Sequence, residues 1–111
     1  MNDWAIVLTT AASETEAEAI AQALIEAKLA ACVNLFPIKS VYVWEGNTER
    51  EQEWQLTIKT RMTQFEAIAS KIQSLHSYDV PELIVLPIEK GSAAYLNWMN
   101  AQVPTENPPS D

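Results

Sequence analysis

Cysteine, histidine and glycine are all scarce in this chain. Its 111 residues include one cysteine, one histidine and two glycines. A single cysteine cannot form a disulfide within the chain, which is typical of proteins that fold in a reducing compartment. Two glycines do not make a glycine-rich loop that could cradle a phosphate group. The sequence therefore favours neither a disulfide-stabilised secreted domain nor a nucleotide-binding loop.

Positive charge and long apolar runs are scarce as well. Seven Lys and Arg residues stand against 15 Asp and Glu, which gives a net charge of −8. Such a surface disfavours unspecific attraction to nucleic acid or to an anionic membrane. No apolar run approaches the roughly 20 residues of a membrane helix, and the first residues lack the pattern of a secretion signal. We expect a cytoplasmic protein with no nucleic-acid or membrane partner.

The composition that remains is that of a globular domain. Hydrophobic residues make up 48% of the chain and charged residues 20%, which is unlike a disordered segment. The length suits a single domain. Residues 104–111 contain three prolines and no apolar anchor. We therefore predict one domain over residues 1–103 and a disordered tail over residues 104–111.

The first half of the chain reads as strand, helix and a long hairpin. An apolar, β-branched run predicts a strand, and Ser13 with Glu16 forms a capping-box pair at the start of a helix. Pro37 places the next strand at an edge or bends it. The predicted elements are a strand at 4–10, a helix at 13–28, strand segments at 31–36 and 40–44, a turn at 45–47 and a return strand at 51–60.

The second half repeats the order on a smaller scale. Thr63 and Glu66 predict the capped start of a second helix that ends near Leu75. A buried-looking strand follows at 83–88, and Ser92 caps a short third helix. Because strand-helix-strand crossovers are right-handed, this order predicts a ferredoxin-like βαββαβ sandwich of the α+β class. Its antiparallel sheet carries both long helices on one face and leaves the other face bare.

The bare face and the strand edges predict association between chains. Tyr42, Trp44 or Trp54 points toward that face whichever register holds. Long hairpin strands also present unpaired backbone groups, which pairing with a neighbouring chain would satisfy. We predict a compact oligomer.

Five motifs, taken in order, resemble those of the CutA family, which is named for divalent-cation tolerance. They are residues 30–34 (AACVN), 40–46 (SVYVWEG), 58–60 (IKT), 75–82 (LHSYDVPE) and 95–98 (YLNW). The similarity runs from about Ala5 to Met99. Ser77 departs from the pattern, because the family more often has proline between the histidine and the tyrosine. The segment around Ile38 is also a residue shorter than the usual form.

The resemblance implies a cytoplasmic homotrimer similar in architecture to the PII signalling proteins. In that wider group, ligand clefts lie between subunits and are lined by the hairpin connection and by the loop after the second helix. Carried onto this chain, those segments are residues 44–53 and 76–82. The implied function is binding of a divalent metal ion, copper or similar, in the response to metal ions. The alternative is a PII-like carrier or sensor of a small polar metabolite.

A metal site is the first chemical hypothesis, with Cys32, His76 and Glu82 as ligands. An imidazole, a carboxylate and a thiolate suit a transition metal, but the spacing of these residues is not diagnostic. The alternative for His76, favoured when the residue is taken by itself, is a loop histidine that is hydrogen-bonded locally. Cys32 lies on an apolar strand without a basic sequence neighbour that would favour the thiolate, so a small buried hydrophobe is the favoured interpretation.

A small-molecule cleft is the competing hypothesis. Aromatic walls, a cation and a carboxylate suit a small polar or zwitterionic metabolite. Lys59 also has a simpler interpretation, a salt bridge across the hairpin. No nucleophile elbow, zinc-protease motif or second histidine is present, so we expect no enzyme. The predicted cleft residues are Tyr42, Trp44, Trp54, Lys59, Tyr78 and Glu82.

Overall fold

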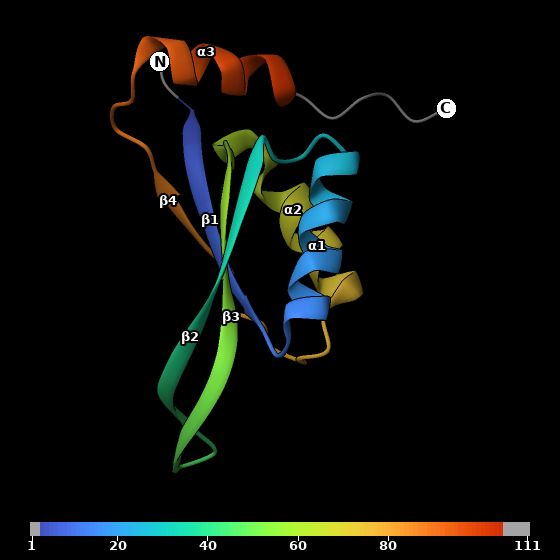
Figure 1. Cartoon of the computed structure of the whole chain (residues 1–111), viewed down its shortest axis with the longest axis vertical. Helices are drawn as coiled ribbons and strands as arrows, with labels where there is room; N and C mark the ends of the chain where they lie inside the picture. The colour runs from blue at the N-terminus through green and yellow to red at the C-terminus, as the bar shows by residue number, and fades with distance from the viewer. Residues whose placement is uncertain (1–2, 106–111) are drawn as a thin grey trace.

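The computed structural model describes residues 3–105, and its elements follow the predicted order. An antiparallel sheet has the strand order β2-β3-β1-β4, and helices α1 and α2 cover one of its faces (Figure 1). This confirms the α+β, ferredoxin-like sandwich with a C-terminal helix. The elements are β1 (Trp4–Ala11), α1 (Glu14–Glu26), β2 (Cys32–Trp44), β3 (Asn47–Arg61), the 3-10 turn η1 (Met62–Gln64), α2 (Phe65–Leu75), β4 (Ile84–Pro87) and α3 (Ala93–Gln102).

The core lies between the sheet and helices α1 and α2. Side chains alternate across a strand, so one set from β1 and β3 points to the helices, and Val7 lies directly opposite Ile58 in the sheet register. Both residues are fully buried, and they pack with Ile20 of α1 and Ile68 of α2. The hydrophobic effect of this one layer therefore holds the sandwich together.

The two long helices begin differently from one another. Ser13 caps α1 as predicted, because its hydroxyl accepts the Glu16 N–H at 3.1 Å. The predicted Thr63 cap of α2 is wrong. The Thr63 hydroxyl instead donates to Asp3 at 3.2 Å, and η1 precedes the helix, which has Gln64 at its N-cap without a side-chain cap bond. Attachment to the start of the chain has replaced the local cap.

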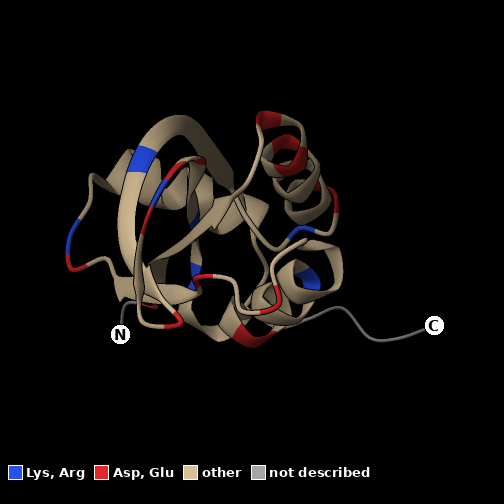
Figure 2. Cartoon of the chain, turned by 90° about the horizontal axis from the view of Figure 1, so that it is seen from below, with Lys and Arg blue, Asp and Glu red and all other residues tan. Residues whose placement is uncertain are grey.

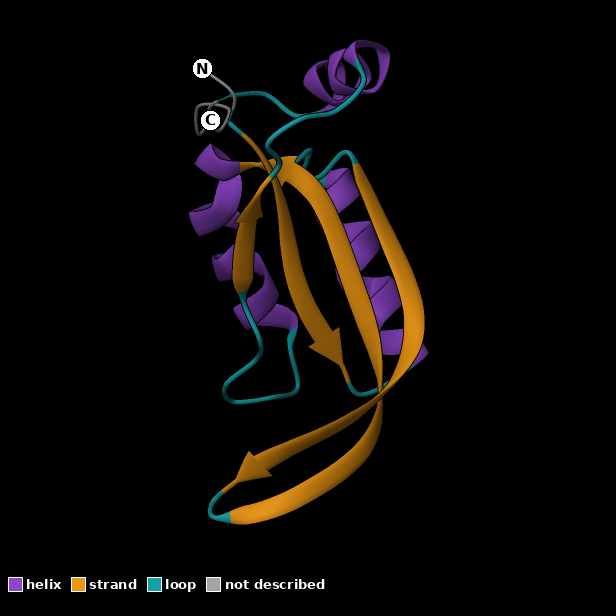
Figure 3. Cartoon of the chain, turned by 90° about the vertical axis from the view of Figure 1, so that its left-hand side faces the viewer, coloured by secondary structure: helices purple, strands orange, loops and turns teal. Residues whose placement is uncertain are grey.

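Strands β2 and β3 form a hairpin that extends far beyond the rest of the sheet. They pair from Cys32–Lys59 to Trp44–Asn47, whereas β1 reaches only Trp54 of β3. The remainder, residues 38–53, is a two-stranded ribbon that projects from the molecule (Figure 3). Glu45 (φ 50°) and Gly46 (φ 80°) close it, as a tight hairpin turn with two positive φ angles requires.

Pro37 lies in β2, an edge strand of the sheet, as expected. The two predicted strand segments around it are one continuous strand, which corrects the boundaries. An edge strand tolerates proline because one of its sides needs no backbone donor. The ribbon exposes large apolar side chains, with Val43 72% and Trp44 50% exposed.

Helix α3 is fastened to the end of the sheet by one buried arginine. Arg61 is 4% exposed; its Nε donates to the Val103 carbonyl at 2.8 Å and its Nη1 to Asp3 at 2.8 Å. Its Nη2 donates to Asn100, and the guanidinium lies 4.2 Å from the centre of the Trp4 ring. The planar fork of arginine suits three acceptors at once.

Past α3, the Pro104 carbonyl accepts a hydrogen bond of 2.8 Å from Gln64. Of the predicted tail, residues 104–111, residues 106–111 lie outside the described residues. Over the described range 3–105, no helix combines the length and the apolarity that crossing a membrane requires.

Candidate functional site

A cleft of about 880 Å³ lies between the ribbon and the loop over residues 76–83. We refer to it as the ribbon cleft. It opens on the sheet face away from α1 and α2, because its wall residues in β3 alternate with Trp54, Leu56 and Ile58, which pack on the helix side. Its lining is Thr10, Ile38, Ser40, Val41, Tyr42, Trp44, Glu49, Glu51, Glu53, Gln55, Tyr78, Asp79, Val80, Pro81 and Glu82.

The ribbon cleft is strongly acidic. Five carboxylates line it, three from β3 and two from the loop, and among its lining residues there is no Lys, Arg or His. Acidic segments along the hairpin are seen in the view from below (Figure 2). Like charges gathered at a concave surface create a negative potential that attracts cations. The cleft is therefore electrostatically suited to a positively charged ligand.

A tyrosine joins the two walls of the cleft. The Tyr78 hydroxyl donates to Glu53 at 2.8 Å, and Glu53 is only 7% exposed. Partial burial, this hydrogen bond and the charges of Glu53 and Glu51 raise the pKa of Tyr78 far above its ordinary value. Desolvation and the nearby glutamates, Glu51 first, also raise the pKa of Tyr42. Both phenols therefore stay protonated and can donate hydrogen bonds.

His76 is held by hydrogen bonds on both ring nitrogens. Its Nδ1 accepts the Tyr78 N–H at 3.0 Å, and its Nε2 lies 2.6 Å from the Thr10 carbonyl. A nitrogen that accepts must carry a lone pair, so the proton is on Nε2, which donates to Thr10. Neither nitrogen has a lone pair left for a metal ion or for proton abstraction. This agrees with the interpretation of His76 as a locally hydrogen-bonded loop histidine.

Glu16, at the start of α1, holds the loop from outside the cleft. Its carboxylate accepts the Ser77 N–H at 2.8 Å and the Ser77 hydroxyl at 3.1 Å, as well as the Ala12 N–H at 3.1 Å. Partial burial works to raise the pKa of Glu16, but these hydrogen bonds and the nearby His76 outweigh it and lower the pKa. Because its pKa is lowered, Glu16 stays ionised and keeps its hold on the loop at neutral pH.

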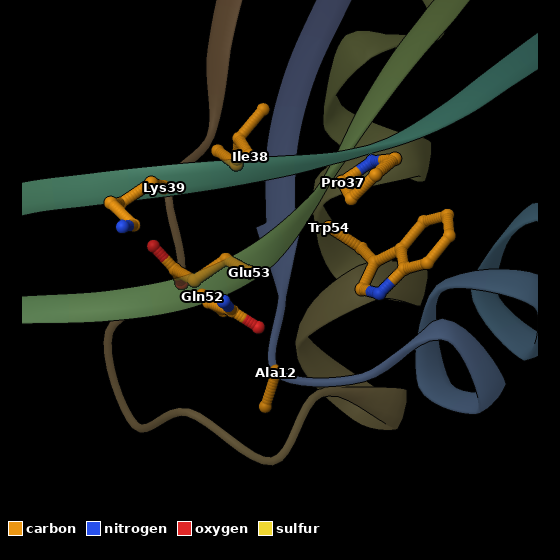
Figure 4. Close-up of a pocket in the computed structure, with 7 residues that line it drawn as sticks. All are labelled: Ala12, Pro37, Ile38, Lys39, Gln52, Glu53 and Trp54. Carbon is orange, nitrogen blue, oxygen red and sulfur yellow. The ribbon is translucent and has the colours of Figure 1, made fainter.

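Four of the six predicted small-molecule residues come together in the ribbon cleft. They are Tyr42, Trp44, Tyr78 and Glu82. Trp54 points to the other face of the hairpin, where it lines a smaller hollow of about 350 Å³ with Pro37 and Gln52 (Figure 4). Its place follows from the register, since it lies opposite Ala11 and Pro37 on the helix side of the sheet.

Lys59 does not reach the ribbon cleft either. It pairs with Ile6 in the body of the sheet, and its ammonium lies 5.7 Å from the centre of the Tyr95 ring of α3. Thr10, which lines the cleft, is four residues further along β1 from Ile6, a separation of about 13 Å along a strand. The sequence showed that Lys59 lies on a strand but not which end of the sheet it would occupy.

The predicted metal ligands Cys32, His76 and Glu82 are not brought together within one chain. Cys32 lies opposite Lys59, at the end of the sheet far from the cleft, and its Sγ lies 3.9 Å from the Asn34 side chain. His76 is occupied by the two hydrogen bonds described above. Among residues 3–105, no three His, Cys, Asp or Glu side chains converge on a point that could hold a metal ion.

The acidic wall of β3 was missed from the sequence. Glu49, Glu51 and Glu53 recur at every second position, and this spacing places them on one face of a strand. That pattern was a usable signal, but it was not distinguished from the general excess of acidic residues. Asp79 lies within residues 76–82, the loop that the family resemblance places at a cleft, and it lines the ribbon cleft. Glu16 could be recognised only as a helix cap.

Comparison with known proteins gives concordant matches. The family model described as "CutA1 divalent ion tolerance protein" matches residues 5–102. The divalent-cation tolerance protein CutA of Archaeoglobus fulgidus is 43% identical over 97 residues, which are 87% of this chain and 95% of that protein. The solved structure of the A. fulgidus protein, described as periplasmic, has a TM-score of 0.89 at 42% identity and covers 91% of this chain and 99% of that one.

A plant structure is equally similar. CutA1 of Oryza sativa has a TM-score of 0.90 at 38% identity and covers 95% of this chain and 97% of that one. The fold and the cleft thus define a small ferredoxin-like protein with an acidic cleft beside a projecting hairpin. Since the family model spans nearly all of the described residues, the chain belongs to the CutA1 divalent ion tolerance family.

Proposed function

We propose that this protein acts in divalent-cation tolerance by binding a divalent metal ion, copper or similar, in the ribbon cleft. Membership of a family named for divalent ion tolerance supports the process. The observation that carries the site is the lining of the cleft, five carboxylates without a basic side chain among them. Oxygen donors bind divalent ions, and at a given site Cu²⁺ binds more tightly than the other divalent ions of its row.

We also propose that the site is completed in a homotrimer. Within the described part of one chain no three ligands converge on a metal ion, and the cleft opens on the bare face of the sheet. Val41, Val43 and Trp44 of the ribbon are each at least half exposed. Exposed apolar side chains beside an unpaired strand edge support burial against another copy. A second chain seated there would bring further carboxylates to the cleft.

Calorimetry with Cu²⁺, Zn²⁺ and Mn²⁺ tests the metal site. We expect affinity in the order Cu²⁺, Zn²⁺, Mn²⁺, and a loss of about tenfold in Glu51→Gln and in Asp79→Asn. Glu66→Gln is the matched control, because it removes the same charge from an exposed position on α2. Equal affinities in all three variants would show that the metal binds elsewhere.

Light scattering on a size-exclusion peak tests the assembly. A homotrimer gives three times the mass of the chain. We expect a lower mass for Val43→Glu, because the proposed contact between chains would then have to bury a charge, which is costly. A monomer mass for the wild-type protein at micromolar concentration would overturn this part of the proposal.

A small cationic metabolite is the second candidate, and the volume of the cleft favours it. About 880 Å³ is far more than one ion needs, and Tyr42, Trp44 and Tyr78 supply aromatic walls. Ammonium groups interact favourably with aromatic faces and carboxylates. A linear aliphatic diamine should then bind and compete with Zn²⁺. Binding of Zn²⁺ unaffected by the diamine would remove this candidate.

We propose further that the protein is not an enzyme and that it is cytoplasmic. Both nitrogens of His76 are engaged, so the chain's one imidazole is not available as a general base. The single cysteine supports a reducing compartment, although the relative from A. fulgidus is described as periplasmic. Fractionation of cells that produce the protein, with a marker enzyme for each compartment, tests the location.

A further inference from the structure

The loop over residues 76–83 forms one wall of the ribbon cleft although it contains no helix or strand. Five of its residues, 78–82, line the cleft, and the loop lies directly above the ribbon (Figure 3). A wall built from irregular backbone has to be held by its side-chain and backbone contacts. The hydrogen bonds at the start of the loop therefore fix the position of this wall of the cleft.

Glu16 makes the connection between this wall and the rigid body of the molecule. Its Oε2 accepts the Ser77 N–H at 2.8 Å, and its Oε1 accepts both the Ser77 hydroxyl and the Ala12 N–H, each at 3.1 Å. Glu16 does not line the cleft. One carboxylate therefore ties the residue before the α1 cap to the first turn of the loop.

These contacts are more than a helix cap requires. In a capping box the glutamate reaches back to the N–H of the capping residue itself, which here is Ser13. Glu16 instead bonds Ala12 and turns its second oxygen toward Ser77, 61 positions along the chain. The long-range bond is the shorter one, and the charge on the carboxylate strengthens it.

The hold on Ser77 is passed to the cleft through its neighbours. The Tyr78 N–H donates to His76, and the Tyr78 hydroxyl donates to Glu53 of the opposite wall. Ser77 lies between His76 and Tyr78 in the chain, so a shift of the Ser77 backbone moves Tyr78 directly. Tyr78 then changes the distance between the loop wall and the ribbon wall.

We infer that Glu16 and Ser77 form a clamp that positions the loop wall of the ribbon cleft, with Glu16 as a positioning residue outside the site. The effect on a bound cation rests on the function proposed above. The effect on the loop does not. The clamp holds the 76–83 loop in the one arrangement in which Tyr78 reaches Glu53.

Amide hydrogen exchange measures the clamp without any ligand. In Glu16→Gln, one acceptor oxygen becomes an NH₂ group, which donates and cannot accept a hydrogen bond, so the side chain can no longer accept all three bonds. We expect exchange at residues 77–79 to be about tenfold faster. Glu14→Gln is the control, because it removes an exposed charge from the same helical turn. Equal exchange in the two variants, with the core amides unchanged, would overturn the clamp.

Ser77→Pro offers a rescue that a purely structural role for Glu16 would not show. His76 has φ −82° and ψ 142°, the extended conformation that a residue before proline adopts. Proline removes both donors to Glu16 but restricts the backbone covalently. We expect Glu16→Gln to leave loop exchange unchanged in the Ser77→Pro background. An effect as large as in the wild-type background would contradict the inference.

Zn²⁺ calorimetry then tests the connection to the cleft. We expect Glu16→Gln to weaken Zn²⁺ binding about three- to tenfold and Ser77→Pro/Glu16→Gln to bind like Ser77→Pro alone. Faster loop exchange with unchanged Zn²⁺ affinity would overturn the positioning role. If the wild-type protein binds no Zn²⁺, the proposed metal function fails, whereas the exchange measurements still decide the clamp.

Discussion

Strands β2 and β3 run through both the helix-covered part of the sheet and the projecting ribbon, but what their side chains contact differs between the two regions. In the covered half, Leu56 and Ile58 of β3 are fully buried against α1 and α2. A few residues earlier on the same strand, Glu49 and Glu51 line an open cleft. The buried side chains of the first region stabilise the domain. The second region exposes charged and apolar side chains that the single chain does not bury. This contrast shows where binding can be built without loss of the core.

The largest difference should appear when an apolar side chain is truncated in each region. Ile58→Ala removes three buried carbons from the core and should cost about 3 kcal/mol of unfolding free energy. Val43→Ala, at a position 72% exposed, should cost under about 0.5 kcal/mol in the isolated chain. Urea denaturation of both variants at several protein concentrations measures this. If the loss of unfolding free energy in Val43→Ala grows with protein concentration, another copy of the chain buries the ribbon.

The next largest effect concerns the two arginines of β3. Arg61→Lys should cost about 2 kcal/mol, because an ammonium cannot reproduce three directed bonds from a buried guanidinium. Arg50→Lys, on the exposed ribbon, is the matched control and should be neutral. Thermal denaturation gives the comparison. Equal melting temperatures for the two variants would mean that the fork of Arg61 does not hold α3.

A smaller effect is expected where the ribbon meets the loop. Tyr78→Phe removes the donor to the nearly buried Glu53 carboxylate and should cost about 1 kcal/mol. Tyr95→Phe, whose residue is 40% exposed on α3, serves as the control. Chemical denaturation gives the free energies. If Tyr78→Phe is as stable as the control, the two walls of the cleft are not coupled through this bond.

The smallest effect is the pH dependence contributed by Glu16. Its pKa is lowered in the folded state, so its contribution to stability is complete above the ordinary glutamate value of about 4.3 and is lost as the pH falls through the lowered value. Between pH 6 and pH 3, Glu16→Gln should therefore lose less melting temperature than the wild-type protein. Glu14→Gln should behave like the wild type in this range. Parallel curves for Glu16→Gln and Glu14→Gln would contradict this.

Much of the fold could be predicted from local patterns. The Ser13 and Ser92 caps, the Glu45–Gly46 turn and the apolar runs of β1 and β4 each act over a few residues, so their signals lie in neighbouring positions. The Thr63 cap failed because a residue 60 positions away, Asp3, takes the hydroxyl. The role of Arg61 was missed for the same reason, since its three acceptors come from both ends of the chain.

The candidate site was predicted only in part. The loop around Tyr78 and Glu82 and the ribbon around Tyr42 and Trp44 could be assigned to one cleft through the family resemblance. The positions predicted for Trp54 and Lys59 were wrong. The register between β1 and β3 sets which face of the sheet a side chain occupies and how far along the strand it lies. A shift of one residue in that register moves every side chain to the other face.

The order of elements, the ferredoxin-like fold class and the family could all be predicted from the amino-acid sequence, because hydrophobic periodicity, caps and motifs are local. The folded chain was needed to show that the carboxylates of β3 and those of the loop line one cleft, and that Cys32 and His76 lie at opposite ends of the sheet. It also turned Glu16 from a helix cap into a clamp on Ser77. The register of the strands and the connections between them set which residues lie close together, and neither can be predicted from the spacing of nearby residues.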